Sequence, residues 1–152
     1  MRKRLIAIPA TAQEQEQRWL DLEHAATVEV TSEDRDFPIQ SSLSLEERQG
    51  WRAAAPGAQT IRLLFDEPQD IRCISLVFEE DKVERTQEFV LRSGGPLREL
   101  IRQQWNFSVP SSIRETEEYR VHLSDVTILE LIIVPDIGGG AARASLKGLR
   151  LA

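Results

Sequence analysis

The chain has 152 residues, enough for one domain with a buried core, and its 41% hydrophobic and 29% charged residues exclude a disordered chain. The net charge of −6 excludes a general binder of polyanions, so no nucleic-acid partner is expected. One cysteine excludes an internal disulfide, and no apolar run approaches the roughly 20 residues of a membrane span, so we expect a cytoplasmic protein with no membrane association.

Residues 1–24 form a predicted N-terminal extension. Its basic start is followed by four apolar residues before Pro9, too few for the apolar region of a signal peptide. Thr11 and Glu14 have the spacing of a capping box, which predicts a short helix from Thr11 toward Leu22. The pattern then changes to alternation, so the predicted domain spans residues 25–152.

The rest of the chain has the alternation typical of strands. Alternating apolar and polar residues predict strands at 26–30 and 61–65, the second ended by Asp66-Glu67-Pro68. Residues 71–78 are apolar on both faces, which indicates a central strand. The alternation of the last strand changes phase at Gly148, where a β-bulge is expected. Further strands are predicted at 87–92, 119–123, 128–134 and 144–151.

Residues 97–107 fit two patterns. Leu97, Leu100 and Ile101 have helical spacing, whereas Leu97, Ile101, Trp105 and Phe107 share one strand parity. Many short strands separated by turns, without alternation of helices and strands, predict an all-β fold, an antiparallel β-sandwich.

Several segments form an ordered set of motifs. Gly50-Trp51 precedes a loop ending at Pro56-Gly57 and the alternating run 59–65, and the segments 87–95 and 144–151 follow. This order resembles that of discoidin-type, galactose-binding-like domains, over about residues 25–151. The resemblance implies a jelly-roll sandwich, and it implies that 97–107 is a strand.

No catalytic constellation is visible, so the chain is predicted not to be an enzyme. His24 and His122 have no nucleophile-elbow neighbour. Cys73 lies in an apolar strand and is interpreted as a packed core residue. The runs of carboxylates are interpreted as solvated loops.

The loop after the first strand contains candidate ligands for a metal ion. Asp34 and Asp36 are candidate ligands of a structural calcium ion, which prefers oxygen donors and which galactose-binding-like domains often hold near this point. The interleaved Arg35 opposes a cation, so we expect no bound cofactor. Trp51 leaves two interpretations open, stacking on a sugar ring or packing beneath a loop.

Strand parity predicts where a ligand binds. Loops of an antiparallel sandwich alternate between its two ends, and counting back from the C-terminus separates the long loops from the short turns 66–70, 93–96 and 124–127. The long loops are 31–38, 45–58, 79–86, 108–118 and 135–143. Polar loops on a rigid scaffold usually carry the binding function. The predicted ligand-binding residues are Arg35, Asp36, Trp51, Arg52, Lys82, Arg85, Asp136 and Arg143.

The predicted function is therefore a non-catalytic module that binds a carbohydrate or another small polar ligand through these loops. The alternative is an intracellular module for protein–protein interaction or scaffolding, a role that the resemblance also implies.

Overall fold

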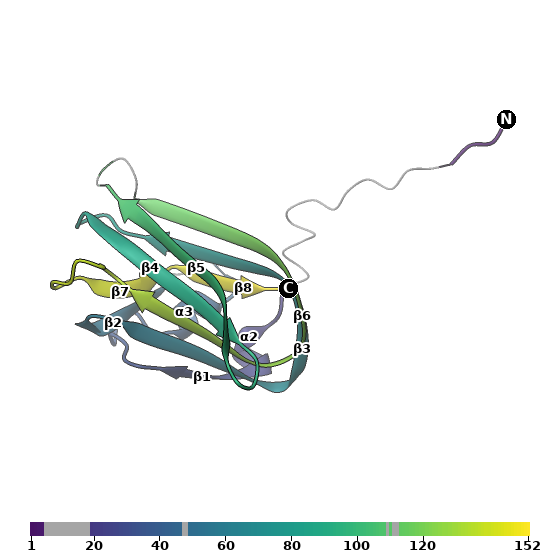
Figure 1. The fold of residues 1–152 in the computed structure, drawn as a ribbon, viewed down its shortest axis with the longest axis horizontal. Coiled ribbons are helices and arrows are strands. Elements are labelled where there is room, and N and C mark those ends of the chain that lie inside the picture. Colours follow the sequence, from purple (N-terminus) through teal and green to yellow (C-terminus); the bar gives the residue numbers. More distant parts are fainter. Residues whose placement is uncertain (5–18, 47–48, 109, 111–112) are drawn as a thin grey trace.

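The computed structural model describes residues 1–4, 19–46, 49–108, 110 and 113–152. Its strands form a sandwich of antiparallel sheets with two short helices beside it, shown in Figure 1. The predicted fold class is confirmed. No helix in the described ranges is long and apolar enough to cross a membrane.

Two long strands serve both layers of the sandwich. β3 (Gln59–Glu79) and β6 (Arg114–Val134) pair with each other along their length and bend midway. The first half of β3 also pairs with β1 (Ala26–Val30), and its second half pairs with β8 (Gly148–Leu151). One layer therefore has the order β1-β3-β6-β4-β5, and the other has β8-β3-β6.

The remaining elements complete the two layers. β4 (Arg85–Ser93) and β5 (Arg98–Phe107) extend the larger layer, and β5 confirms that 97–107 is a strand and not a helix. β2 (Trp51–Pro56) pairs with β7 (Arg143–Leu146) in a small sheet of its own. Part of the segment expected as loop 45–58, residues 51–56, is thus a strand.

The two short helices contribute to the core. α2 (Leu22–Ala25) and α3 (Gln40–Leu43) have only four residues each, so tertiary packing must hold them. Leu22 and Leu43 are buried in the core, and the Ser42 hydroxyl donates a hydrogen bond of 2.5 Å to the Leu146 carbonyl. Most of the helix predicted from Thr11 lies outside the described residues.

Two predicted strand breaks are wrong. Asp66-Glu67-Pro68 lies within β3, and residues 124–127 lie within β6. The register between the two strands shifts at Gln69, Ile71 and Cys73, so the unpaired residues are absorbed as irregularities. The chain bends there without leaving the sheet.

The phase change near the C-terminus has a different cause from the predicted bulge. β7 pairs with β2 and β8 pairs with β3, so the chain changes sheets between them. Lys147 lies at the change and donates its backbone N–H to the Val77 carbonyl at 2.8 Å. Leu146 and Leu149 both face the core as a result.

Gly50 has a steric reason for its place before Trp51. Its φ is +87°, a conformation that L side chains rarely adopt, and an added Cβ would lie 2.6 Å from the Leu146 carbonyl oxygen. Because glycine has no side chain, β2 can approach the β7–β8 junction closely. Trp51, the next residue, is buried there at 1% exposure.

An aromatic cluster fills the core between the layers. The rings of Phe78 and Trp105 have centroids 5.0 Å apart, and Phe78 and Phe89 stack at 5.6 Å. Tyr119 and Phe107 extend the cluster at its sides. Such rings dominate the burial of apolar surface, so this cluster fixes the distance between the layers.

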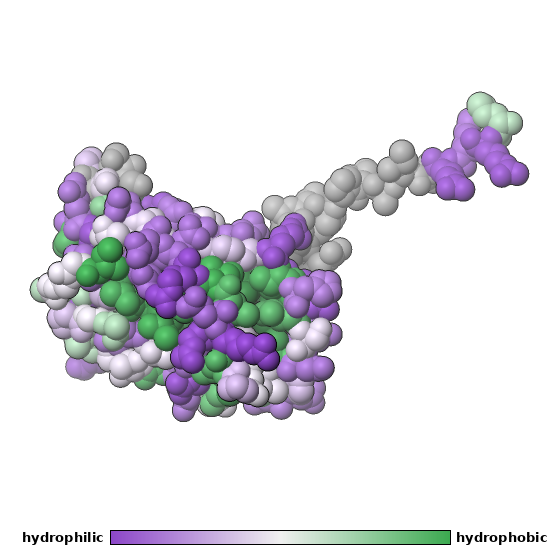
Figure 2. Space-filling model, in the orientation of Figure 1, coloured by the Kyte–Doolittle hydropathy of each residue, from purple (hydrophilic) through white to green (hydrophobic). Residues whose placement is uncertain are grey.

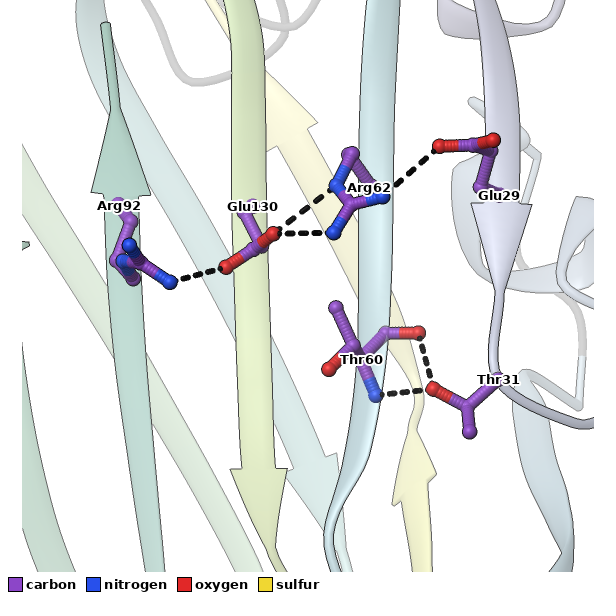
Figure 3. A network of polar contacts seen from close by, with 6 residues as sticks. All are labelled: Glu29, Thr31, Thr60, Arg62, Arg92 and Glu130. Carbon is purple, nitrogen blue, oxygen red and sulfur yellow. Dashed lines mark hydrogen bonds and ion pairs between the residues drawn. The ribbon is translucent and has the colours of Figure 1, made fainter. Parts of the chain in front are cut away.

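A row of charges crosses the outer face of the larger layer, as Figure 3 shows. Glu130 is 2% exposed, and its carboxylate accepts hydrogen bonds from Arg62 at 2.8 Å and from Arg92 at 2.9 Å. Arg62 also donates to Glu29 at 3.1 Å. The row joins four neighbouring strands, and the two guanidinium groups compensate a carboxylate that would be costly to bury alone.

Candidate functional site at the loop end

The sandwich has two different ends. The segments 31–38, 80–84 and 135–142 form the loop end, at the left of Figure 1. The bend end, at the right, is formed by the bends 66–70 and 124–127 and by the turn 93–96. The two bends lie side by side, because Gln69 pairs with Val126 and the Asp125 N–H donates to Asp70 Oδ1 at 3.0 Å.

Half of the loop end is built on the segment 31–38. The Asp34 N–H donates to the Arg52 carbonyl at 2.8 Å, and the Arg52 N–H donates to the Phe37 carbonyl at 3.2 Å. Arg52 Cζ lies 5.5 Å from the centroid of the Phe37 ring. Arg143 forms an ion pair with Asp34 at 3.9 Å. Two arginines from different strands are thus brought to one loop.

The other half is held by Arg85. Its side chain is 1% exposed and donates to Glu80 Oε1 at 2.9 Å, to Gln87 Oε1 at 2.7 Å and to the Pro135 carbonyl at 2.6 Å. Its Cζ lies 4.8 Å from the centroid of the Phe107 ring. Burial lowers the pKa of the Arg85 guanidinium, and the ion pair with Glu80 opposes that shift. Arg85 therefore ties the segment 80–84 to the segment 135–142.

The two halves meet around this buried guanidinium. The charges of Asp136 and Arg52 both act on Arg85. The Asp136 carboxylate accepts the Gly138 N–H at 3.0 Å, and the Ile137 N–H donates to the Thr86 carbonyl at 2.9 Å. The loop end is therefore a fixed arrangement of charged groups.

Six of the predicted ligand-binding residues are exposed or half-buried at this end. They are Arg35, Asp36, Arg52, Lys82, Asp136 and Arg143. Leu45 lies elsewhere, because its carbonyl accepts a hydrogen bond from Arg150 of β8 at 3.1 Å. Leu45 is therefore not part of the loop end, although the parity count placed the predicted loop 45–58 there.

Trp51 and Arg85 require a revision of the prediction. Both side chains are buried, and the Trp51 indole donates to the Ser32 carbonyl at 3.0 Å. A ligand arriving from solvent would not reach either residue, so they support the loops from below. For Trp51, the packing interpretation is the one that fits the structure.

Of the two candidate calcium ligands, the Asp34 carboxylate is engaged within its own loop, as is that of the neighbouring Glu33. Glu33 Oε2 accepts the Ile39 N–H at 2.9 Å, and Asp34 Oδ1 accepts the Asp36 N–H at 2.9 Å. In the described part of the chain, no three His, Cys, Asp or Glu side chains are grouped so that they could hold a metal ion. These oxygens stabilise the turn.

Sequence reasoning missed the partners of Arg85, although one signal was present. Arg85 and Gln87 share the parity of Phe89 and Leu91, which face the core. That parity indicates that Arg85 points inward. No local pattern indicates Pro135, because it lies 50 residues away along the chain.

The residues considered for catalysis are scattered. His24 pairs with Asp21 at 2.6 Å on an exposed surface, and His122 is exposed on β6. Cys73 is half-buried and lies outside the core cluster, so its interpretation as a core residue is wrong. Desolvation raises the pKa of the Cys73 thiol, which favours the unreactive protonated form.

Comparison with solved structures identifies the fold to which this architecture belongs. No protein-family model matches the sequence, and no curated protein matches it significantly. A family 32 carbohydrate-binding module from Clostridium perfringens NanJ, solved in complex with galactose, matches with a TM-score of 0.63. Its sequence is 13% identical, and the match covers 88% of this chain and 96% of that chain. The chain has the galactose-binding-like fold.

Two further structures show the breadth of this galactose-binding-like fold. A C. perfringens module in complex with GalNAc-β-1,3-galactose has a TM-score of 0.62 at 16% identity, over 88% of this chain and 98% of that one. The reduced XRCC1 structure, bound to the catalytic domain of DNA polymerase β, has a TM-score of 0.60 at 12% identity. That match covers 85% of this chain and 95% of XRCC1 as solved. The galactose-binding-like fold thus accommodates both sugar and protein partners.

Proposed function

We propose that this galactose-binding-like domain is a non-catalytic module that binds a carbohydrate, or another small polar ligand, at the loop end. The observation that carries the proposal is the position of solvent-accessible Arg52 and Asp136 near the buried Arg85, with Arg143 held at the same end by its ion pair with Asp34. Arg35, Asp36 and Lys82 lie on the same loops. The rigid support means that a ligand would meet groups already in place, which lowers the entropic cost of binding.

The side chains suit the hydroxyl groups of a sugar. Guanidinium groups donate and carboxylates accept, so together they match both functions of neighbouring hydroxyls. The half-buried Phe37, which Arg52 covers in part, adds apolar surface of the kind that packs against a sugar ring. The similar modules were solved with galactose and with GalNAc-β-1,3-galactose, which makes these two sugars the first ligands to test.

Isothermal titration with galactose and GalNAc-β-1,3-galactose, followed by a glycan array, tests the proposal. We expect Arg52→Ala and Arg143→Ala each to weaken binding by more than about 1 kcal/mol, roughly fivefold. Arg102→Ala, on the outer face of β5, is the matched control and should bind normally. If both loop-end variants bind as the native protein does while changes at the bend end abolish binding, the site is at the wrong end.

The alternative is a protein-interaction module acting through the outer face of the larger layer. Figure 2 shows apolar surface beside charged side chains on this face, where strand parity places the half-buried Leu64, Ile128 and Ile132. The similar XRCC1 structure was solved with a protein partner. Leu64→Lys with Ile132→Lys should abolish co-purification of a native partner and leave sugar binding unchanged. The opposite result favours the carbohydrate site.

We also propose that the protein works in the cytoplasm, without a nucleic-acid or membrane partner. The lone cysteine and the net charge of −6 support this location and these exclusions. Fractionation of native cells tests the location directly.

A further inference from the structure

A cavity of about 270 Å³ opens at the bend end. Three segments line it: the turn 93–96, the start of β5 and residues 122–126 of β6. Ordinary ligand sites occupy roughly 300–1,000 Å³, so this cavity suits a small ligand. It is separate from the loop end, and neither the predicted sites nor the proposed function uses it.

One wall of the cavity is held by side chains that hydrogen-bond its backbone. Asp125 has a φ of +54°, uncommon for a residue other than glycine, and Asp70 holds it by accepting its N–H at 3.0 Å. Arg72 donates to the Leu123 carbonyl at 2.8 Å from the neighbouring strand. These two contacts hold the side of the cavity that β6 forms.

The side chains of Arg98 and His122 at this cavity have no partner among the residues that the structure describes. Neither the Arg98 guanidinium nor the His122 ring forms a hydrogen bond or ion pair with another described residue. Nearby arginines differ, because Arg92 is paired with Glu130 and Arg102 with Glu99. Arg98 and His122 therefore keep their donor capacity for a ligand.

The other lining residues define what that ligand must carry. Leu100, Leu123 and Val126 supply apolar surface, which suits a ring or a short hydrocarbon body. Asp125 is also in the lining, and because its carboxylate repels negative charge, a ligand should carry no more than the one negative charge that Arg98 can neutralise. The combination favours a single negative charge on a compact, partly apolar molecule.

We propose that the bend-end cavity binds a small, singly charged carboxylate attached to a ring or short apolar body. Arg98 and His122 hydrogen-bond the carboxylate, since an arginine fork matches carboxylate geometry. Leu100, Leu123 and Val126 contact the body. This site acts independently of the sugar site at the loop end.

Two matched pairs of probes test the role of the carboxylate: galacturonate against galactose, and benzoate against benzyl alcohol. Titrations followed by amide chemical shifts in ¹⁵N-labelled protein locate each binding event. We expect an acid to shift amides of residues 93–98 and 122–126 and to bind at least tenfold more tightly there than its neutral partner. Binding of galacturonate alone indicates a sugar acid, and binding of benzoate alone indicates an aromatic acid.

The variant Arg98→Gln removes the charge at an exposed position, and we expect it to weaken binding of the acid at least fivefold. Arg102→Gln on the same strand and Arg52→Ala at the loop end are controls that should leave it unchanged. The proposal is overturned if neither acid binds at about 10 mM, if the neutral probes bind equally well, or if Arg98→Gln has no effect. In each of these cases, galactose-induced changes in the amide chemical shifts of the loop end alone would still support the proposed function.

Discussion

The two ends of the sandwich are stabilised in different ways. At the loop end, long segments are held by a side-chain network, in which Arg85 joins Glu80, Gln87 and Pro135. At the bend end, two paired strands turn together, and the contact that fixes their shape runs from a backbone N–H of Asp125 to Asp70. One end depends on a single buried cation, and the other depends on the conformation of the backbone.

This difference determines how well each end tolerates amino-acid substitutions. Exposed residues on the loop end can vary while Arg85 stays, because the support lies beneath them. The bend end has less freedom, because its shape comes from strand pairing that also forms both layers. Four predictions, from the largest expected effect to the smallest, test this comparison.

Arg85→Met should destabilise the protein by about 3–5 kcal/mol, because it leaves Glu80 buried without its cation and the Pro135 carbonyl without a donor. Urea denaturation measures the loss. Arg102→Met is the matched control, since Arg102 pairs with Glu99 at 53% side-chain exposure and should contribute less than about 1 kcal/mol. Equal effects of the two variants would show that the loop end does not depend on Arg85.

Gly50→Ala tests a backbone contact in the same assay. We expect a loss of about 2–3 kcal/mol, since the new Cβ meets the Leu146 carbonyl and the φ of +87° is unfavourable for alanine. Gly57 has a φ of +93° and no atom within 4 Å of an added Cβ. Gly57→Ala should therefore cost only about 1 kcal/mol. A similar loss in both variants would assign the whole effect to the backbone angle.

Asp125 tests the backbone of the bend end. Asp125→Val should destabilise the protein by about 1–2 kcal/mol, because a β-branched residue tolerates the φ of +54° poorly. Asp125→Gly should stay within about 0.5 kcal/mol of the native protein, since glycine adopts this angle freely. Chemical denaturation of both variants distinguishes the angle from the carboxylate. A large loss in Asp125→Gly would mean that the carboxylate stabilises the bend.

The smallest effect concerns pH. A hydrogen bond with Glu117, assisted by partial burial, raises the pKa of Glu115 to about 7. The folded state therefore holds a proton that the unfolded state releases at lower pH. This contribution to stability is present at low pH and is lost as the pH rises through about 7.

Thermal denaturation between pH 4.5 and 8 measures that loss. Glu115→Gln should remove this part of the pH dependence and raise the melting temperature at pH 8 by about 1–2 °C. Glu118→Gln, an exposed neighbour on β6, controls for the loss of one negative charge. Parallel pH profiles of Glu115→Gln and the native protein would contradict the coupling of the two carboxylates.

Local alternation was sufficient to predict much of the fold. Ile61 and Leu63 point into the core and Arg62 points out, as the sequence pattern requires, because successive side chains of a strand face opposite sides. The count of strand directions also placed segments 31–38, 80–84 and 135–142 at one end of the sandwich, although it placed Leu45 there wrongly. The resemblance of the motifs around Gly50-Trp51 to galactose-binding-like domains also agreed with the structure.

Tertiary structure determined the bends, the changes of sheet and the burial of charged residues, which the local sequence pattern does not predict. Asp66-Glu67-Pro68 has the composition of a turn, but pairing with β6 keeps it inside β3 as a bend. Lys147 marks a change of sheet, which depends on both β2 and Val77. The burial of Arg85 depends on Pro135, 50 residues away, so a side chain that looked available for a ligand is a support. A strand's alternation depends on neighbouring residues, whereas its partners are fixed only when distant segments pack together.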